Sequence, residues 1–277
     1  MKLTRRNFLK LSLATCCSSS ALYLSEEAQA YKPSNIVVEK VNIKLNNLPE
    51  DFEDFSIAQI SDLHRSEVVE NDVISKTISK VNSLKPDLIV ITGDIANNLN
   101  YLEDCIPGLK NLSAPEGTYI VGGNWERARG IKKSNNMIKN AGLNILDNRY
   151  KIISKGKKKI YLAGVDDDGG IGNTLESTFK NINDKALKIL LSHNPYITVH
   201  LSKAKKPIDL VLSGHTHGGQ VIYPFIGAIK VPRAFGKEYI SGLYNLKNTR
   251  LYINRGIGVV CFPYRINCPP EITLFKL

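Results

Sequence analysis

Short runs of apolar residues recur along the chain, and each ends where glycine or polar residues take over. Runs of this length predict buried strands, here at residues 55–60, 88–92, 118–121, 159–165, 187–192 and 210–213. Between the first runs, apolar residues recur at helical spacing in the segment that ends at Leu84 and in the segment before Gly142. Strands predominate after Tyr150, with further candidates at residues 221–223, 238–246, 249–254 and 272–277.

This order of elements predicts an α/β fold that starts as βαβα. The 277 residues are 43% hydrophobic and 23% charged, which is the ordinary mixture of a globular protein and excludes disordered, collagen-like and disulfide-scaffold classes. No stretch reaches the roughly 18 to 20 uninterrupted apolar residues of a bilayer-spanning helix, so a polytopic membrane protein is excluded. Without a linker or an internal repeat, residues 31–277 are predicted to form one domain.

Residues 1–30 have a different organisation, typical of a removable export signal. Arg5 and Arg6 are followed by Phe8, a weakly hydrophobic stretch runs to Leu24, and residues 28–30 form an A-x-A cleavage pattern. The paired arginines resemble the twin-arginine type of signal; an ordinary Sec signal that holds two arginines is the alternative, and a lipid anchor at Cys16 is a poorer fit. We therefore expect an exported protein, located in the periplasm or at the outer face of the cytoplasmic membrane.

The net charge bears on the binding partners, and the cysteines bear on the kinds of metal site and disulfide that are possible. The formal net charge of +11 favours anionic partners, including peripheral contact with an anionic membrane surface, although a codon-biased genome explains abundant lysine equally well. Without the signal, Cys105, Cys261 and Cys268 remain, with no C-x-x-C pair, so a zinc ribbon is excluded. Cys261 and Cys268 either bridge the loop between them or are buried thiols.

Chemically active residues follow the predicted strands, at the edge where open α/β sheets bind their ligands. Four of the five histidines stand in these loops. The candidates are Asp62 and His64 after the first strand, Asp94 after the second, Asn124, Trp125 and Glu126 after the third, His193 after the run at 187–192, and His215 and His217 after the run at 210–213.

The spacing of these candidates predicts a dinuclear metal site. Asp-x-His and His-x-His place both side chains on the same side of an extended segment, so each loop offers two ligands to one point. Two aspartates, four histidines and one asparagine are too many for one tetrahedral ion and suit two ions that share a carboxylate. The mixed nitrogen and oxygen set favours two divalent ions of Mn, Fe or Zn over Mg or Ca.

The ordered blocks D-x-H, G-D, G-N-x-[DE], a later single H, and G-H-x-H resemble those of the calcineurin-like metallophosphoesterases. The resemblance implies a four-layer α/β/β/α sandwich with the dinuclear site at the strand ends. It also implies that the first metal is held by Asp62, His64 and His217, the second by Asn124, His193 and His215, and that Asp94 bridges both. The run from Gly214 to Gln220 and residues 162–166 and 267–273 are similar to the exported bacterial branch, and to hydrolases of UDP-2,3-diacylglucosamine.

One position departs from the family pattern. Trp125 stands where the family usually has the histidine that contacts the phosphoryl oxygen and helps the leaving group depart, and an indole N–H only donates a hydrogen bond. Asp94, Asn124 and Trp125 are therefore the expected catalytic positions. Arg127 and Arg265 are candidates for gripping a phosphate, with solvated surface arginines as the alternative. His200 is expected to be structural.

The function predicted is hydrolysis of a phosphoester by a monomeric, two-metal enzyme. A phosphodiesterase or pyrophosphatase acting on an envelope substrate, such as a phospholipid or a UDP-diacylglucosamine-like compound, is the first hypothesis. A nucleotide or nucleic-acid phosphodiesterase is the alternative; a specific nucleic-acid partner is not expected, because aromatic and basic residues are not interleaved. Because Trp125 replaces the histidine, a non-catalytic metal-binding envelope protein is the second alternative.

Overall fold

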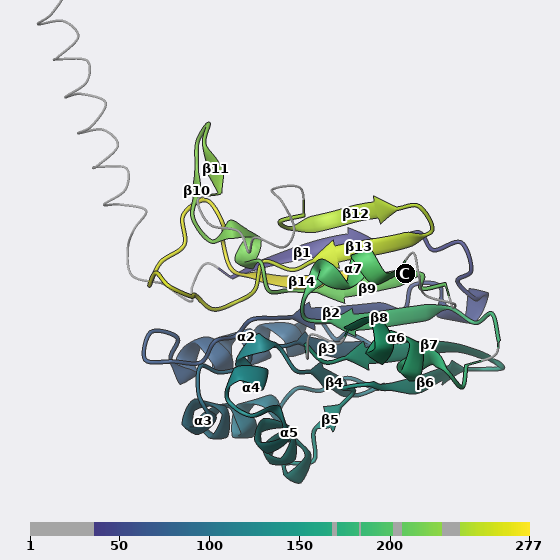
Figure 1. The fold of residues 1–277 in the computed structure, drawn as a ribbon, viewed down its shortest axis with the longest axis horizontal. Helices are drawn as coiled ribbons and strands as arrows, with labels where there is room; N and C mark the ends of the chain where they lie inside the picture. The colour runs from purple at the N-terminus through teal and green to yellow at the C-terminus, as the bar shows by residue number, and fades with distance from the viewer. Residues whose placement is uncertain (1–35, 168–170, 183, 202–206, 229–238) are drawn as a thin grey trace, which may run out of the picture.

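The structure is a computed structural model, and it describes residues 36–167, 171–182, 184–201, 207–228 and 239–277. The expected export signal at residues 1–30 lies outside the described residues. Two six-stranded sheets form the centre of the molecule (Figure 1). Within the described ranges, no helix is both long and apolar enough to cross a membrane.

The first sheet contains the strands of the N-terminal half and one strand from the C-terminal end of the chain. Its order is β1 (Val37–Asn42), β14 (Glu271–Lys276), β2 (Ser56–Ile60), β3 (Leu88–Thr92), β4 (Thr118–Val121) and β5 (Asn144–Ile145). Strands β2 to β5 run parallel, whereas β14 pairs antiparallel with β2 and parallel with β1. The carboxyl ends of β2, β3 and β4 therefore meet at one edge.

The second sheet is built from the C-terminal half. Its order is β12 (Gly242–Leu246), β13 (Thr249–Ile253), β9 (Leu210–Ser213), β8 (Lys188–Ser192), β7 (Lys158–Val165) and β6 (Arg149–Lys155). The four inner strands are parallel and both edge strands are antiparallel. The loops that follow β8 and β9 thus lie at a common edge as well.

Helices cover the outer faces of the two sheets. Four helices lie between strands β2 and β5 in the chain: α2 (Asn71–Ser83), α3 (Leu99–Leu109), α4 (Asn124–Ala128) and α5 (Ile131–Asn140). The second half contributes α6 (Ile171–Phe179) and α7 (Thr198–Leu201). Short 3-10 turns are η2 (Glu50–Phe52), η3 (Pro195–Ile197) and η4 (His217–Gly219), and β10 (Ile222–Tyr223) and β11 (Gly227–Ala228) form a small hairpin.

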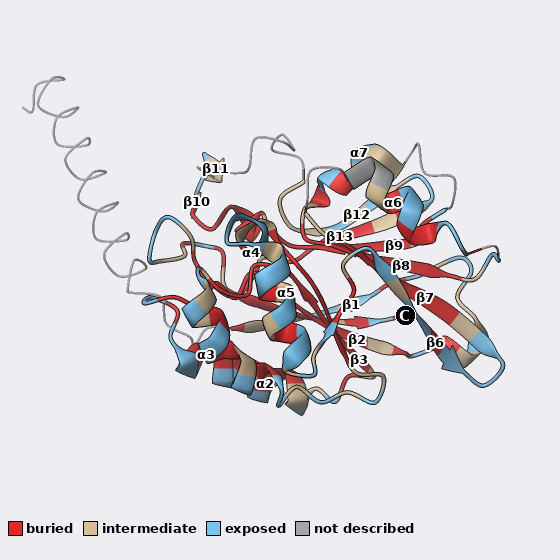
Figure 2. Ribbon diagram, turned by 60° about the horizontal axis from the view of Figure 1, so that its bottom comes forward, coloured by how far each residue is buried: buried red, intermediate tan, exposed pale blue. Residues whose placement is uncertain are grey.

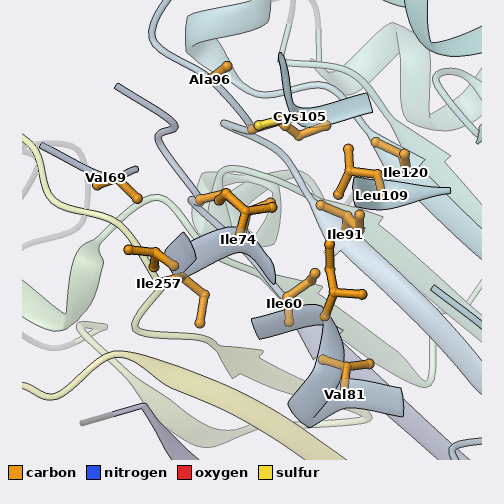
Figure 3. Close-up of a cluster of buried hydrophobic side chains, with 14 of the residues drawn as sticks. Ile60, Val69, Ile74, Val81, Ile91, Ala96, Cys105, Leu109, Ile120 and Ile257 are labelled. Atoms are coloured by element: carbon orange, nitrogen blue, oxygen red, sulfur yellow. The ribbon is translucent and has the colours of Figure 1, made fainter. Parts of the chain in front are cut away.

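Three apolar clusters show how these layers pack. One lies between the two sheets and includes Ile57, Val90, Leu162 and Leu212. A second joins the outer face of the first sheet to α2, α3 and α5 (Figure 3). The third joins β7, β8 and β9 to α6. The inner strands of both sheets are buried while the helices expose their outer faces, so the expected α/β fold is confirmed as four layers, α/β/β/α (Figure 2).

Candidate dinuclear metal centre

The loop after β2 brings Asp62 and His64 into the interior. Both side chains are buried, and both residues have left-handed backbone, with φ of 50° and 46°. Ser61 donates its hydroxyl to Asp62 Oδ2 at 2.5 Å, and the N–H of His215 lies 3.1 and 3.0 Å from the two carboxylate oxygens. The Asp62 carboxylate is thereby fixed between the loop after β2 and the loop after β9.

A contact that the sequence did not reveal orients the ring of His64. Its Nδ1 lies 2.8 Å from Oδ1 of Asn97, which makes Nδ1 the protonated nitrogen. Its Nε2 is buried and has no hydrogen-bond partner among the described residues, although Oδ2 of Asp94 is 3.5 Å away. A histidine that binds a metal ion usually donates its other ring N–H to an oxygen atom, as Nδ1 does here. The buried Nε2 is then left as the nitrogen that could bind the ion.

Asp94, after β3, stands between two histidines. Its Oδ2 is 3.5 Å from His64 Nε2 and 3.2 Å from His193 Nε2, while its Oδ1 accepts the N–H of Trp125 at 2.8 Å. Burial opposes ionisation, but the histidines and the hydrogen bonds lower the pKa of Asp94 to about 2. One charged carboxylate oxygen therefore faces both halves of the site, as a bridging ligand must.

The second half of the site collects side chains from three strand ends. His193 donates Nδ1–H to the carbonyl of Thr92 at 2.8 Å, which turns its Nε2 toward Oδ1 of Asn124 at 3.0 Å and Nδ1 of His215 at 3.1 Å. Burial and the nearby His193 lower the pKa of His215. A neutral imidazole is the form that binds a metal ion, so this shift suits a ligand.

His217 completes the first half. It begins η4, its Nε2 is 3.5 Å from Asp62 Oδ1, and its ring lies 4.9 Å from that of His64. Burial and the neighbouring His64 hold the pKa of His217 well below its usual range. Two close histidines and a carboxylate form a donor set that suits a cation.

The described residues thus contain two candidate ligand groups. Asp62, His64 and His217 offer ligand atoms within 4.8 Å of one another, and so do Asp94, His193 and His215. The first group has the same residues as the first ligand set expected from the sequence. The second contains His193 and His215 of the other expected set together with Asp94, and Oδ1 of Asn124 lies 3.0 Å from His193 Nε2. Buried carboxylate oxygens and ring nitrogens, one of which has no hydrogen-bond partner among the described residues, form a donor set that suits metal ions.

The ligand loops share an uncommon backbone conformation. A positive φ is rare outside glycine and occurs mainly where function requires it. Five residues of the site adopt it, with φ between 46° and 73°: Asp62, His64, Asp94, His215 and His217. Each turn redirects the chain at the end of a strand, and the surrounding hydrogen bonds hold it there. These five are among 13 non-glycine residues with positive φ in the described chain, so the conformation is common to the ligand loops but is not confined to them.

Two glycines let the loops approach closely. Space beside Gly123 is taken by the carboxylate and backbone N–H of Asp94, and space beside Gly214 by the side chains of Ser61 and Asp62. Any side chain at either position would collide with the site. These glycines therefore bring the two halves together.

Glu126 is a site residue whose role the sequence reading did not assign. Its buried carboxylate accepts the N–H groups of Asp94 at 2.9 Å, Ile95 at 2.8 Å and Gly123 at 2.8 Å. Burial and the charge of Asp94 raise the pKa of Glu126 to about 7. Glu126 fastens the loop after β3 to the loop after β4, and so places Asp94 against Asn124.

Trp125 lies at the edge of the first ligand group. Its ring makes an edge contact with that of His64, with 5.4 Å between ring centroids. The guanidinium of Arg129, one helical turn further on, lies 5.3 Å from the centre of the indole. Trp125, the position expected to lack a proton donor, thus presents an aromatic ring, and the guanidinium of the exposed Arg129 lies over that ring.

The arginines expected to grip a phosphate have contacts within the protein. Arg127 is exposed and donates to the carbonyl of Asp167 at 2.8 Å. Arg265 donates to several backbone carbonyls, including those of Arg255 at 2.9 Å and Gly258, and its Nη2 lies 3.4 Å from Nδ1 of His217. Arg265 therefore supports the loop beside the site, and a phosphate contact for either arginine remains a prediction.

The remaining candidates lie outside the ligand groups. Cys268 is buried, and its thiol donates to the carbonyl of His217 at 3.2 Å. Cys261 is exposed, and no disulfide joins these two cysteines of the described chain. His200 lies on α7, where its ring contacts Tyr196.

Comparison with known proteins places the site in a family context. The family model for calcineurin-like phosphoesterases matches residues 55–219, which is more than half of the chain and includes every candidate ligand. The resemblance inferred from the sequence motifs is confirmed by this match.

Three relatives that align with this chain over most of their own length support the same family assignment. The chain is 35% identical to Uncharacterized metallophosphoesterase YkuE of Bacillus subtilis, over 100% of this chain and 98% of the relative. It is 29% identical to Phosphodiesterase YaeI of Escherichia coli, over 99% of both chains. It is 32% identical to an uncharacterized metallophosphoesterase of Aquifex aeolicus, over 87% of this chain and 91% of the relative.

Proposed function

Because the chain belongs to the calcineurin-like phosphoesterase family and is a phosphoester hydrolase, we propose that it cleaves a phosphodiester or diphosphate bond of an extracytoplasmic substrate with two bound metal ions. One observation carries the reaction class: Asp94 Oδ2 lies between His64 Nε2 and His193 Nε2, at 3.5 and 3.2 Å. That placement supports one carboxylate serving both candidate ligand groups, as a dinuclear centre requires.

The residues define what each part of the centre does. Two divalent ions bound here would activate a water and neutralise the phosphoryl oxygens. Asp62, His64 and His217 would hold one ion, Asn124, His193 and His215 would hold the other, and Asp94 would serve both. Glu126 and Asn97 keep Asp94 and His64 in these positions. The protein's task is positioning, so no covalent intermediate on a side chain is required.

Trp125 indicates which kind of phosphoester bond the site would cleave. An indole cannot protonate a departing alkoxide, whereas the phosphate released from a diphosphate leaves without being protonated first. A diphosphate such as a UDP-linked lipid precursor, or a diester with an acidic leaving group, therefore suits this site better than a dialkyl diester. One relative, which aligns with this chain over 99% of its own length, is named Phosphodiesterase YaeI. That name supports cleavage of a diester-type bond.

Export is the second part of the proposal. The paired residues Arg5 and Arg6 and the A-x-A pattern at residues 28–30 support delivery through the twin-arginine route to the outer face of the cytoplasmic membrane. The net charge of +11, of which residues 31–277 carry +9, supports an anionic partner there. Nucleotides and nucleic acids are the alternative anionic substrates.

Metal removal and readdition test the reaction. Protein treated with a chelator should lose hydrolysis of bis(p-nitrophenyl) phosphate and of UDP-N-acetylglucosamine, and should regain it with Mn, Fe or Zn. Asp94→Asn should lower turnover at least about 100-fold, because the shared carboxylate is lost. Asp72→Asn, which changes an exposed aspartate on α2, is the matched control. Full activity after chelation would contradict the proposal.

A further inference from the structure

We propose that two apolar loop tips beside the metal centre insert into an anionic phospholipid surface and hold the mouth of the site against it. These tips carry Phe225, Ile226 and Phe262, which we call the apolar rim. The binding surface follows from the rim itself. That the substrate is presented by the membrane rests in addition on the proposed function.

The first tip is the turn of the hairpin formed by β10 and β11. Phe225 is fully exposed and Ile226 is 72% exposed. Phe225 also has left-handed backbone, with φ of 67°, at a turn position that glycine or asparagine would fill without strain. A bulky apolar residue that is both strained and exposed gains nothing for the fold. This arrangement indicates that the side chain acts outside the folded core.

The second tip lies in the loop between β13 and β14. Phe262 is 43% exposed, and its neighbours Cys261 and Pro263 are exposed as well. The ring of Phe262 stacks on that of Tyr264, with 5.6 Å between centroids. The loop therefore presents an ordered aromatic surface.

Gln220 ties the two tips together. Its buried side chain donates to the carbonyls of Phe262 at 3.0 Å and Tyr264 at 3.1 Å, and accepts the N–H of Val260 at 2.8 Å. Directly after it, the N–H of Ile222 donates to the carbonyl of Ile266 at 3.0 Å. These hydrogen bonds join the hairpin and the loop between β13 and β14 into one unit.

The same unit is attached to the metal centre. His217, a ligand candidate, begins η4, and Gln220 follows directly after this turn. Ala228 of the hairpin fills the space beside Gly219, and the thiol of Cys268 contacts the carbonyl of His217. Figure 1 shows the hairpin standing away from the body of the molecule, next to the loop between β13 and β14. A surface that holds the rim would lie at a fixed distance from the site.

The shape and composition of the rim favour a lipid partner. A stable protein interface takes about 20 to 30 residues a side, whereas the rim offers three exposed apolar residues on protruding tips. A bilayer adapts to such tips and accepts aromatic and aliphatic side chains at its boundary. The net charge of +11 attracts an anionic membrane surface. A protein partner would be attracted in the same way only if its own surface were acidic.

Vesicle binding tests this proposal on the full chain. The probe is vesicles of phosphatidylglycerol and phosphatidylcholine, sedimented at a lipid concentration that binds half of the wild-type protein. The variant F225S/I226S/F262S should bind about 10- to 100-fold more weakly, because the apolar contacts are lost. The control I152S/V199S/L243S alters three exposed apolar residues elsewhere, each 40 to 46% exposed, and should bind as the wild type does. Both variants keep residues 1–35, so any contribution of that segment cancels.

Further measurements separate the possible failures. Hydrolysis of soluble bis(p-nitrophenyl) phosphate should be unchanged in the rim variant, which shows that it is folded. Equal vesicle binding by wild type and rim variant, with soluble activity intact, would overturn the rim proposal alone. Absent activity in the metal-loaded wild type would overturn the proposed function instead. A dimer in the wild type that the rim variant loses, together with unchanged vesicle binding, would assign the rim to a second copy of this chain.

Discussion

Oδ1 of Asn97 lies 2.8 Å from Nδ1 of His64, and this contact turns the other ring nitrogen toward the carboxylate of Asp94. The ring is buried, and its edge rests against Trp125. Its orientation therefore depends on a residue that does not itself reach the ligand group. Such outer contacts set both the proton position and the direction of a histidine ligand.

Asn97→Ala should weaken metal binding at the first ligand group by about 10- to 100-fold, because the His64 ring is no longer held. The second group, which contains His193 and His215, should keep its affinity. Metal content per chain during stepwise chelator titration measures both. Asn248→Ala, at an exposed asparagine, is the control. Equal loss from both groups would show that Asn97 acts on the whole fold.

Glu126→Gln should lower the free energy of unfolding by roughly 2 kcal/mol, because an amide has one acceptor oxygen for three buried N–H groups. Activity should fall as well, since Asp94 loses its support. Chemical denaturation and turnover measure the two effects, with Glu103→Gln at an exposed site of α3 as the control. Unchanged stability would refute the fastening role.

Trp125→His should raise hydrolysis of substrates with alkoxide leaving groups relative to aryl esters, because general acid catalysis contributes about 10²- to 10⁴-fold. The gap between methyl p-nitrophenyl phosphate cleaved at its aryl bond and a dialkyl diester should narrow. Rates for both substrates in wild type and variant give the comparison. If both respond equally, Trp125 is a packing or substrate-stacking residue.

Arg5→Lys combined with Arg6→Lys should leave an active, metal-loaded precursor in the cytoplasm. The ligands come from five loops and assemble only in the folded chain, and the twin-arginine route carries folded proteins, so metal insertion should precede export. Cell fractionation and metal analysis of each fraction provide the measurement. Normal export of the double variant would argue for a Sec signal and against cytoplasmic metal loading.

The strands and ligands were predictable because buried parallel strands have a strong local signature. The predicted strands at 88–92, 118–121 and 210–213 coincide with β3, β4 and β9. Each is almost wholly buried, so its residues are continuously apolar. A ligand placed directly after such a strand is located as soon as the strand is.

Other features depend on contacts that a linear pattern does not encode. The helix α3 contains Pro107, which argues against a helix in sequence terms, and the edge strand β6 mixes lysines with exposed apolar residues. Asn97 acts through a hydrogen bond to His64, and Glu126 through hydrogen bonds to Asp94 and Ile95, all residues about 30 positions away in the sequence. Arg265 is conspicuous as a cation near the site, yet backbone carbonyls take up much of its hydrogen-bonding capacity.

The place of β14 has a consequence for biosynthesis. This strand, residues 271–276, lies between β1 and β2 and joins them into one sheet. A nascent chain on the ribosome therefore has an incomplete first sheet until these residues have emerged. Until then β2, which leads into the loop that carries Asp62 and His64, has only one of its two neighbouring strands, β3. We therefore expect the first sheet, and with it the support of this ligand loop, to be completed only at the end of synthesis.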